Sequence, residues 1–164
     1  MSEKNILIAV NKEHLDNILD GVKKIEWRKK ALPLGVAYGY ETKNKGGCGM
    51  VTGEFEVVEN IKFNLHGDTY RPEWLAKGCV PYEFLVEYAN GAEYLYANII
   101  GKAKRYAKPK ALSEFKRYCF QYGKVDCHEC MQWGQKNIFC LRQPIKRPPQ
   151  SYMFVEPLKE NTDD

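Results

Sequence analysis

The hydrophobic pattern changes abruptly near the start of the chain. Residues 5–10 are an apolar run, NILIAV, and predict a buried strand. In the next segment apolar side chains recur three and four residues apart, which predicts an amphipathic helix over about residues 12–20. Asn11 stands where its side chain can cap the helix start, and Gly21 stands where helices commonly end in the left-handed conformation.

Strict alternation of polar and apolar residues follows this helix. Lys24, Glu26 and Arg28 fall on one face of an extended segment, and Ile25 and Trp27 fall on the other. This pattern is typical of a strand with one buried face. It predicts that Trp27 belongs to the core rather than to a stacking surface.

The rest of the chain is also rich in predicted strands. β-Branched and aromatic residues cluster or alternate over 36–42, 50–63, 93–106 and 151–155. Gly53, inside the second of these segments, indicates a bulge or a close approach of another part of the backbone.

Prolines mark the predicted helices of the second half. Short helices are expected after Pro72 and Pro81, each followed by a glycine that suits a helix end. Another helix is expected over about 112–122, after Pro109, with Ser113 as its cap. Because helices are confined to connections between strands, the pattern predicts an α+β fold, and a small barrel-like sheet with helices across its openings would accommodate it.

Composition limits the class of protein. The chain has 164 residues, of which 44% are apolar, so one domain with a real core is expected. No apolar run approaches the roughly 20 residues that span a bilayer, and the N-terminus has no secretory signal pattern, so we expect a cytoplasmic protein without a membrane partner. Neither a phosphate-binding P-loop nor a dinucleotide fingerprint is present in the sequence.

Charge is unevenly distributed, although the formal net charge is only +4. Residues 101–124 carry eight bases against Glu114 alone, and residues 54–93 carry eight acids against three bases. Residues 142–147 add three more bases. This asymmetry suggests a polyanionic partner, and an ordinary solvated surface would also explain it.

The segment after the first predicted helix resembles a family motif. Gly21, Lys23, Glu26 and Arg28 reproduce the Gly-x-Lys-x-x-Glu-x-Arg pattern of the ASCH family in the PUA-like superfamily. A later Gly-Glu pair at residues 53–54 is similar to a second family feature, and the segments AKPKALSEFKRY and RPPQSYMFVE resemble the closing helix and strand of that family.

This resemblance implies a single domain over 1–164, with a PUA-like mixed β-barrel of five to six strands, helices packed around it, and a cysteine-containing insertion at about 119–141. It also implies a cleft near the motif that binds RNA or a modified nucleoside. Some family members are amidohydrolases on acetylated cytidine, which use a lysine matched by Lys23, a threonine three residues later and a separate glutamate. Here the threonine position is Glu26, so that chemistry does not carry over unchanged.

The motif side chains suit recognition of a nucleotide. A guanidinium such as that of Arg28 matches phosphate or a base edge, and Glu26 can orient neighbouring cations or accept from an exocyclic amino group. A buried Lys23 would be an anion anchor, or a base or nucleophile if its pKa is lowered. An intramolecular pair between Glu26 and Arg28 that only supports the sheet edge is the alternative.

Outside the motif, further binding residues are predicted from the basic and the proline-held segments. Lys102 represents the basic segment, which would contact phosphates. Two prolines hold the later segment extended, and it offers cationic, amide, hydroxyl and aromatic groups: Arg147, Gln150, Ser151 and Tyr152.

The six cysteines include one C-x-x-C pair, Cys127 and Cys130, whose spacing lets two thiolates bind one zinc ion. No second such pair is present in the sequence, so free thiols without a cofactor are the main expectation and zinc the alternative.

Three functions therefore remain open from the sequence. The first is a binding module for RNA or a modified nucleotide, which would not be an enzyme. The second is an amidohydrolase acting on an acylated nucleoside, with Lys23, Glu26 and Glu54 as candidate catalytic residues. The third is a protein-interaction domain without catalysis.

Overall fold

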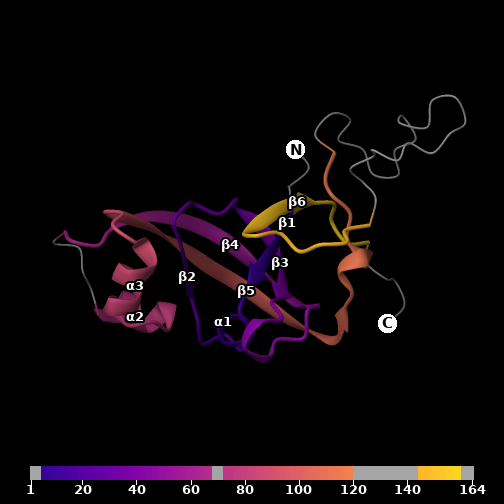
Figure 1. Ribbon diagram of the computed structural model, residues 1–164, viewed down its shortest axis with the longest axis horizontal. Coiled ribbons are helices and arrows are strands. Elements are labelled where there is room, and N and C mark those ends of the chain that lie inside the picture. The colour runs from indigo at the N-terminus through magenta and orange to yellow at the C-terminus, as the bar shows by residue number, and fades with distance from the viewer. Residues whose placement is uncertain (1–4, 68–71, 120–143, 160–164) are drawn as a thin grey trace, which may run out of the picture.

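The structure, a computed structural model, describes residues 5–67, 72–119 and 144–159. Its centre is a six-stranded sheet in the order β2-β5-β4-β3-β1-β6 (Figure 1). The strands are β1 (Asn5–Val10), β2 (Ile25–Arg28), β3 (Gly35–Glu41), β4 (Val51–Asn64), β5 (Tyr94–Lys110) and β6 (Tyr152–Val155). β1 runs parallel to β3, and the other pairs are antiparallel, so the sheet is mixed.

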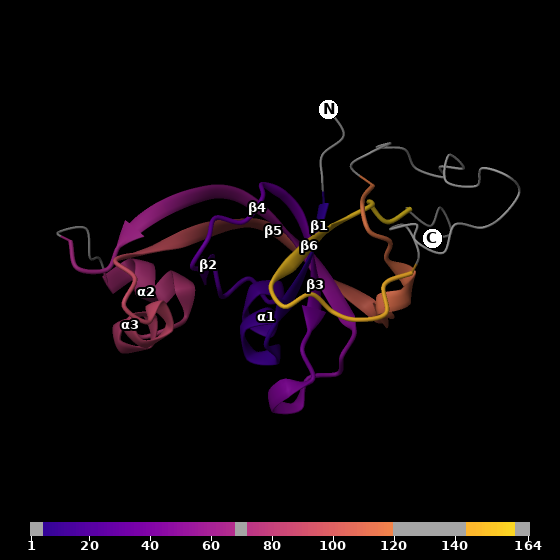
Figure 2. The ribbon, with the colours of Figure 1, turned by 45° about the horizontal axis from the view of Figure 1, so that its top comes forward.

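Helices cover one side of this sheet. They are α1 (Lys12–Leu19), α2 (Pro72–Gly78) and α3 (Tyr82–Ala89), with short 3₁₀ turns η1 (Asn44–Gly46) and η2 (Leu112–Glu114). The long strands β4 and β5 arch across the molecule, with α2 and α3 beneath one end and α1 nearer the middle (Figure 2). None of the described helices is long and apolar enough to cross a membrane.

The predicted α+β class and the strand positions are confirmed. Each predicted strand overlaps an observed one, β4 has the predicted length, and β5 extends four residues beyond its predicted end at residue 106. The term barrel fits only loosely, because in the described residues β2 and β6 are the two edges of an open sheet. The predicted insertion at about 119–141 lies, beyond Cys119, outside the described residues.

The predicted helix after Pro109 is wrong within the described residues. Only a single 3₁₀ turn forms, closed by a hydrogen bond from the Ala111 amide to Glu114 rather than by a cap from Ser113. Beyond it the chain is extended, and Arg117 bridges to Val155 of β6. Long-range pairing with β6 therefore overrides the helical periodicity of this segment.

Two local predictions concern single residues. Gly53 stands at a register shift between β4 and β5, and a Cβ there would lie 2.5 Å from the Lys104 carbonyl oxygen, so both a bulge and a close backbone approach are confirmed. Asn11 does precede α1, but its side chain makes no cap. Its Oδ1 instead accepts a hydrogen bond from Thr42 Oγ1 at 2.9 Å, which ties the start of α1 to the end of β3.

The core of the described residues consists of three clusters, one around Phe115 and Ile145 and two that include the helices. Leu15, Ile18 and Leu19 of α1 pack against the middle of the sheet. A second cluster contains Trp27 of β2, Leu85 of α3, and residues from the C-terminal half of β4 and the N-terminal half of β5. Residues of α1 and α3 line a hollow, and the motif residues Lys23, Glu26 and Arg28 form part of its wall.

Candidate functional site

The hollow is a pocket of about 360 Å³, within the roughly 300–1,000 Å³ range of small-molecule sites. Its walls come from the end of β1, the first turn of α1, the strand β2, the segment after β3, and α3. Lys23, Glu26 and Arg28 all line it. Lys23, which follows the end of α1, and Arg28 of β2 thus line the same cavity.

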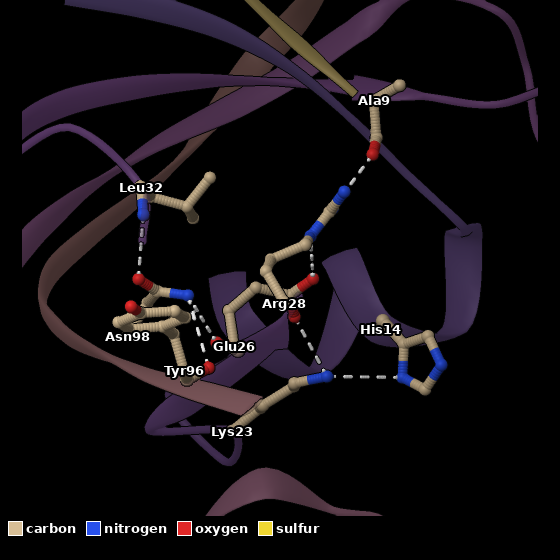
Figure 3. Close-up of polar contacts among 8 residues, drawn as sticks. All are labelled: Ala9, His14, Lys23, Glu26, Arg28, Leu32, Tyr96 and Asn98. Carbon is tan, nitrogen blue, oxygen red and sulfur yellow. Dashed lines mark hydrogen bonds and ion pairs between the residues drawn. The ribbon is translucent and has the colours of Figure 1, made fainter. Parts of the chain in front are cut away.

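Glu26 lies at the centre of a buried charge array in the pocket wall (Figure 3). Lys23 Nζ is 2.9 Å from Glu26 Oε2, and Arg28 Nε donates to Glu26 Oε1 at 3.0 Å. The side chains of Lys23 and Glu26 are only 3% and 7% exposed, and that of Arg28 is 16% exposed. Arg28 Nη2 also donates to the carbonyl oxygen of Ala9 at 3.0 Å, which links β2 to β1 across the pocket.

Local backbone structure brings these side chains together. Gly21 adopts a left-handed φ of 75° and ends α1, and the Lys23 amide then donates to the Asn17 carbonyl at 2.8 Å. This turn directs the chain from α1 into β2. The alternation of β2 then places Glu26 and Arg28 on the same side of the strand.

Asn98 of β5 holds the strand that carries Glu26. Its side chain is fully buried, and its Nδ2 donates to the Glu26 carbonyl oxygen at 3.0 Å (Figure 3). Its Oδ1 accepts from the Leu32 amide at 2.9 Å and from Asn60 at 2.7 Å. Asn98 therefore fixes β2 and the segment after it against β5, which limits how far the carboxylate can move.

Electrostatics keep the carboxyl group of Glu26 ionised. Burial alone would raise its pKa, but the charges of Lys23 and Arg28 outweigh burial and lower it below the ordinary value of 4.5. His14 of α1 lies beside the array, with Nδ1 3.4 Å from Lys23 Nζ. Burial first, and the charge of Lys23 second, lower the pKa of His14 below 6.5. At neutral pH the site therefore contains a carboxylate and an uncharged imidazole.

These pKa shifts predict that acid destabilises the protein in two steps. In each case the unfolded chain binds a proton more readily than the folded chain, so the free energy of unfolding falls as pH falls. The loss begins near pH 6.5 for His14 and near pH 4.5 for Glu26. Urea denaturation of wild type and His14→Gln between pH 7.5 and 5 should give a smaller slope for the variant. Equal slopes would contradict the placement of His14 against Lys23.

Of the predicted binding residues, Lys23, Glu26, Arg28 and Gln150 come together at the pocket. Lys24, which the alternation places on the same face as Glu26, is exposed, and the lysine that pairs with Glu26 is Lys23. Trp27 is a core residue as predicted, 5% exposed, although it also forms part of the pocket wall.

The other predicted residues do not line this pocket. Lys102, Arg147 and Ser151 are exposed elsewhere, and Tyr152 packs partly against the α1 side of the core. Glu54 accepts a hydrogen bond from Tyr106 at 2.6 Å and is likewise absent from the pocket wall.

The zinc prediction concerns residues that the structure does not describe. Cys127 and Cys130 lie outside the described residues. Among residues 5–67, 72–119 and 144–159, no group of histidine, cysteine, aspartate or glutamate side chains could hold a metal ion. Cys48, Cys79 and Cys119 are free thiols. Zinc at the C-x-x-C pair stays a prediction.

Sequence reasoning missed the aromatic part of the site. His14, Phe84 and Tyr88 all line the pocket, and their rings contact one another in series. His14 stands in the first turn of α1, where a surface position is the ordinary expectation, and α3 is separated from the motif by more than fifty residues. The spacing of Phe84 and Tyr88 by four residues places both on one helix face, but that pattern does not reveal which pocket the face borders.

This open mixed sheet with flanking helices has the fold of an ASCH domain, as the resemblance implied. The crystal structure of ASCH from Zymomonas mobilis matches with a TM-score of 0.62 and 16% identity, covering 94% of this chain and 90% of that chain. A serine-to-alanine mutant of that protein matches with a TM-score of 0.62 and 15% identity, over 94% and 89% of the two chains. A tyrosine-to-phenylalanine mutant of the same protein matches with a TM-score of 0.58 and 15% identity, covering 93% of this chain and 91% of that chain. No family model and no curated protein matches the sequence.

Proposed function

We propose that the protein is a binding module that takes one base of an RNA or of a modified nucleotide into the pocket between α1, β2 and α3. The observation that carries this proposal is the buried Lys23–Glu26–Arg28 array in a wall of a pocket that Phe84 and Tyr88 also line. Fixed polar groups opposite aromatic rings are the combination by which proteins recognise an unstacked base.

Glu26 is the group that would read the base edge. Glu26 Oε2 is buried beside Lys23, whereas Oε1 has about two acceptor positions and accepts from Arg28 Nε at one of them, so the second position on Oε1 is the one for a ligand. An ionised carboxylate accepts hydrogen bonds and cannot donate them. It therefore favours bases with an exocyclic amino group, such as cytosine and adenine, over uracil.

The two cations add an electrostatic preference for a nucleotide. Lys23 and Arg28 together exceed the charge of Glu26 by one, so the array has a net charge of +1. Arg28 uses Nε and Nη2 in its described contacts, and its planar group is suited to phosphate. A phosphate on the sugar of the bound nucleotide would therefore be attracted to the pocket.

Calorimetric titration with cytidine, adenosine and uridine, and with a mixed-sequence single-stranded RNA, tests the proposal. We expect cytidine or adenosine to bind more tightly than uridine, and the affinity for RNA to fall as salt rises. Lys23→Ala should weaken binding, whereas Lys24→Ala, at the adjacent exposed lysine, should not. Absence of binding to all of these ligands at low salt would refute the proposal.

A second candidate function is hydrolysis of an acylated nucleoside. It is supported by the buried Lys23–Glu26 pair, because a lysine beside a carboxylate is an arrangement used for base and nucleophile chemistry. Binding is better supported, since the lowered pKa makes Glu26 a weak base and since Glu54 is hydrogen-bonded to Tyr106 away from the pocket. Incubation with N4-acetylcytidine decides the matter: formation of cytidine, lost in Lys23→Ala, would establish the hydrolase.

A further inference from the structure

We infer that the ligand is a single strand of at least two nucleotides, and that a second base stacks on Phe84 and Tyr88 at the pocket mouth while the first lies inside. This inference rests on the proposed function, because it places the second base relative to a first base in the pocket. We name the outer surface formed by Phe84, Tyr88 and Lys29 the aromatic ledge.

The geometry of the ledge suits stacking. The rings of Phe84 and Tyr88 are nearly parallel, with an interplanar angle of 4° and centroids 6.3 Å apart. They stand one helical turn apart on α3, and both line the pocket, so the ledge is continuous with it. Leu85 and Ala89 of the same helix are buried in the core, which fixes the orientation of the rings.

The exposure of Phe84 is the feature that core packing does not explain. Phe84 is 43% exposed, although it is a large apolar residue in a well-packed helix. Its neighbour His14 contacts the ring from the pocket side, with centroids 6.1 Å apart and the planes at 57°. One aromatic face is thus left at the mouth of a polar pocket, where the base next to a buried base would lie.

Lys29 provides the charge for the phosphate between the two bases. It directly follows Arg28 at the end of β2, it is exposed, and its Nζ lies 5.5 Å from the centroid of the Tyr88 ring. A cation on the ledge, next to the Tyr88 ring that also lines the pocket, matches a backbone phosphate that joins two nucleotides. Aromatic stacking with a nearby cation is how sequence-tolerant single-strand binders hold successive bases.

The experiment compares ligands that differ by one nucleotide. Affinities are measured for cytidine, cytidine 3′-monophosphate and the dinucleoside monophosphate CpC, and for the matching adenosine series. Stacking of the second base should make CpC or ApA bind roughly 5- to 100-fold more tightly than the mononucleotide. Phe84→Ala should remove most of this gain, measured within the variant as the ratio of the CpC affinity to the cytidine 3′-monophosphate affinity. Val86→Ala, at a residue of α3 that is 38% exposed and does not line the pocket, is the matched control and should retain the gain.

The salt dependence separates a phosphate contact from a structural role of Lys29. For Lys29→Ala the slope of log affinity for CpC against log salt should become shallower by about 0.7, the value for one phosphate on a single strand. If nucleosides bind but the dinucleotides bind no more tightly than the mononucleotides, or if Phe84→Ala keeps the gain, the ledge is refuted and the proposed function stands. If no nucleoside, nucleotide or dinucleotide binds, both fail.

Discussion

Replacing Glu26 with alanine is expected to lower the free energy of unfolding by about 3–5 kcal/mol. The substitution leaves Lys23, whose side chain is 3% exposed, without its 2.9 Å counter-ion and next to the second cation Arg28. A buried charge without a partner costs far more than the net contribution of the pair itself. Because domains of this size are stable by only about 5–15 kcal/mol, urea denaturation should detect the change easily.

Asp20→Ala is the matched control for this prediction. Asp20 also forms an ion pair with an arginine, at 2.9 Å from Arg105, but its side chain is 59% exposed. Exposed pairs contribute about 0–1 kcal/mol, so this variant should stay near wild type. A similar small effect for both variants would mean that the charge array at the pocket is solvated rather than buried.

Replacing Glu26 with glutamine is expected to reduce the preference for amino-bearing bases by about 1–3 kcal/mol, which is roughly 5- to 150-fold in the ratio of affinities. The amide can donate hydrogen bonds where the carboxylate only accepts them. Cytidine should therefore lose affinity, while uridine, with a carbonyl oxygen at the equivalent edge, should lose little. Parallel titrations with the two nucleosides give the ratio directly.

Glu59→Gln removes a carboxylate of β4 that is exposed and absent from the pocket wall, and it should leave the ratio unchanged. Circular dichroism of both variants at the titration temperature verifies that they are folded. An unaltered cytidine-to-uridine ratio in Glu26→Gln would show that Glu26 supports the sheet edge and does not read the base.

Local patterns in the sequence predicted the parts of the fold that local interactions determine. The apolar face of α1 and the alternation in β2 depend on neighbouring residues, and they predicted the helix and the shared face of Glu26 and Arg28. Lys23 was assigned to the same site only through the motif resemblance. The extended segment after η2 was missed because its partner, Val155 of β6, is almost forty residues away in the chain. The apolar Phe115 of that segment is buried, with 1% of its surface exposed, but it enters the core from an extended chain rather than from a helix.

The composition of the pocket depended equally on long-range arrangement. Nothing near Phe84 in the sequence indicates that α3 will lie opposite α1, since the long strands β4 and β5 carry it there. The role of Asn98 was hidden for the same reason: an asparagine inside a strand acquires meaning only when Glu26 and Leu32 are known to lie beside it. The position of basic residues such as Lys102 relative to the pocket was not predictable either, because sequence charge does not reveal which face of the protein a side chain occupies.

The central claim is that a base occupies the pocket beside Lys23, Glu26 and Arg28, and a ¹H–¹⁵N correlation titration with CpC and ApA tests it most directly. The indole of Trp27 is a reporter beside the site, because Trp27 lines the pocket and its buried Nε1, next to Gly78 of α2, has no hydrogen-bond partner among the described residues. A Trp27→Phe variant assigns its resonance. The account predicts saturable shifts of the Trp27 indole and of the backbone amides of His14, Lys23 and Phe84. Saturable binding that leaves these resonances unmoved and shifts those of Lys102 and Lys104 instead would contradict it.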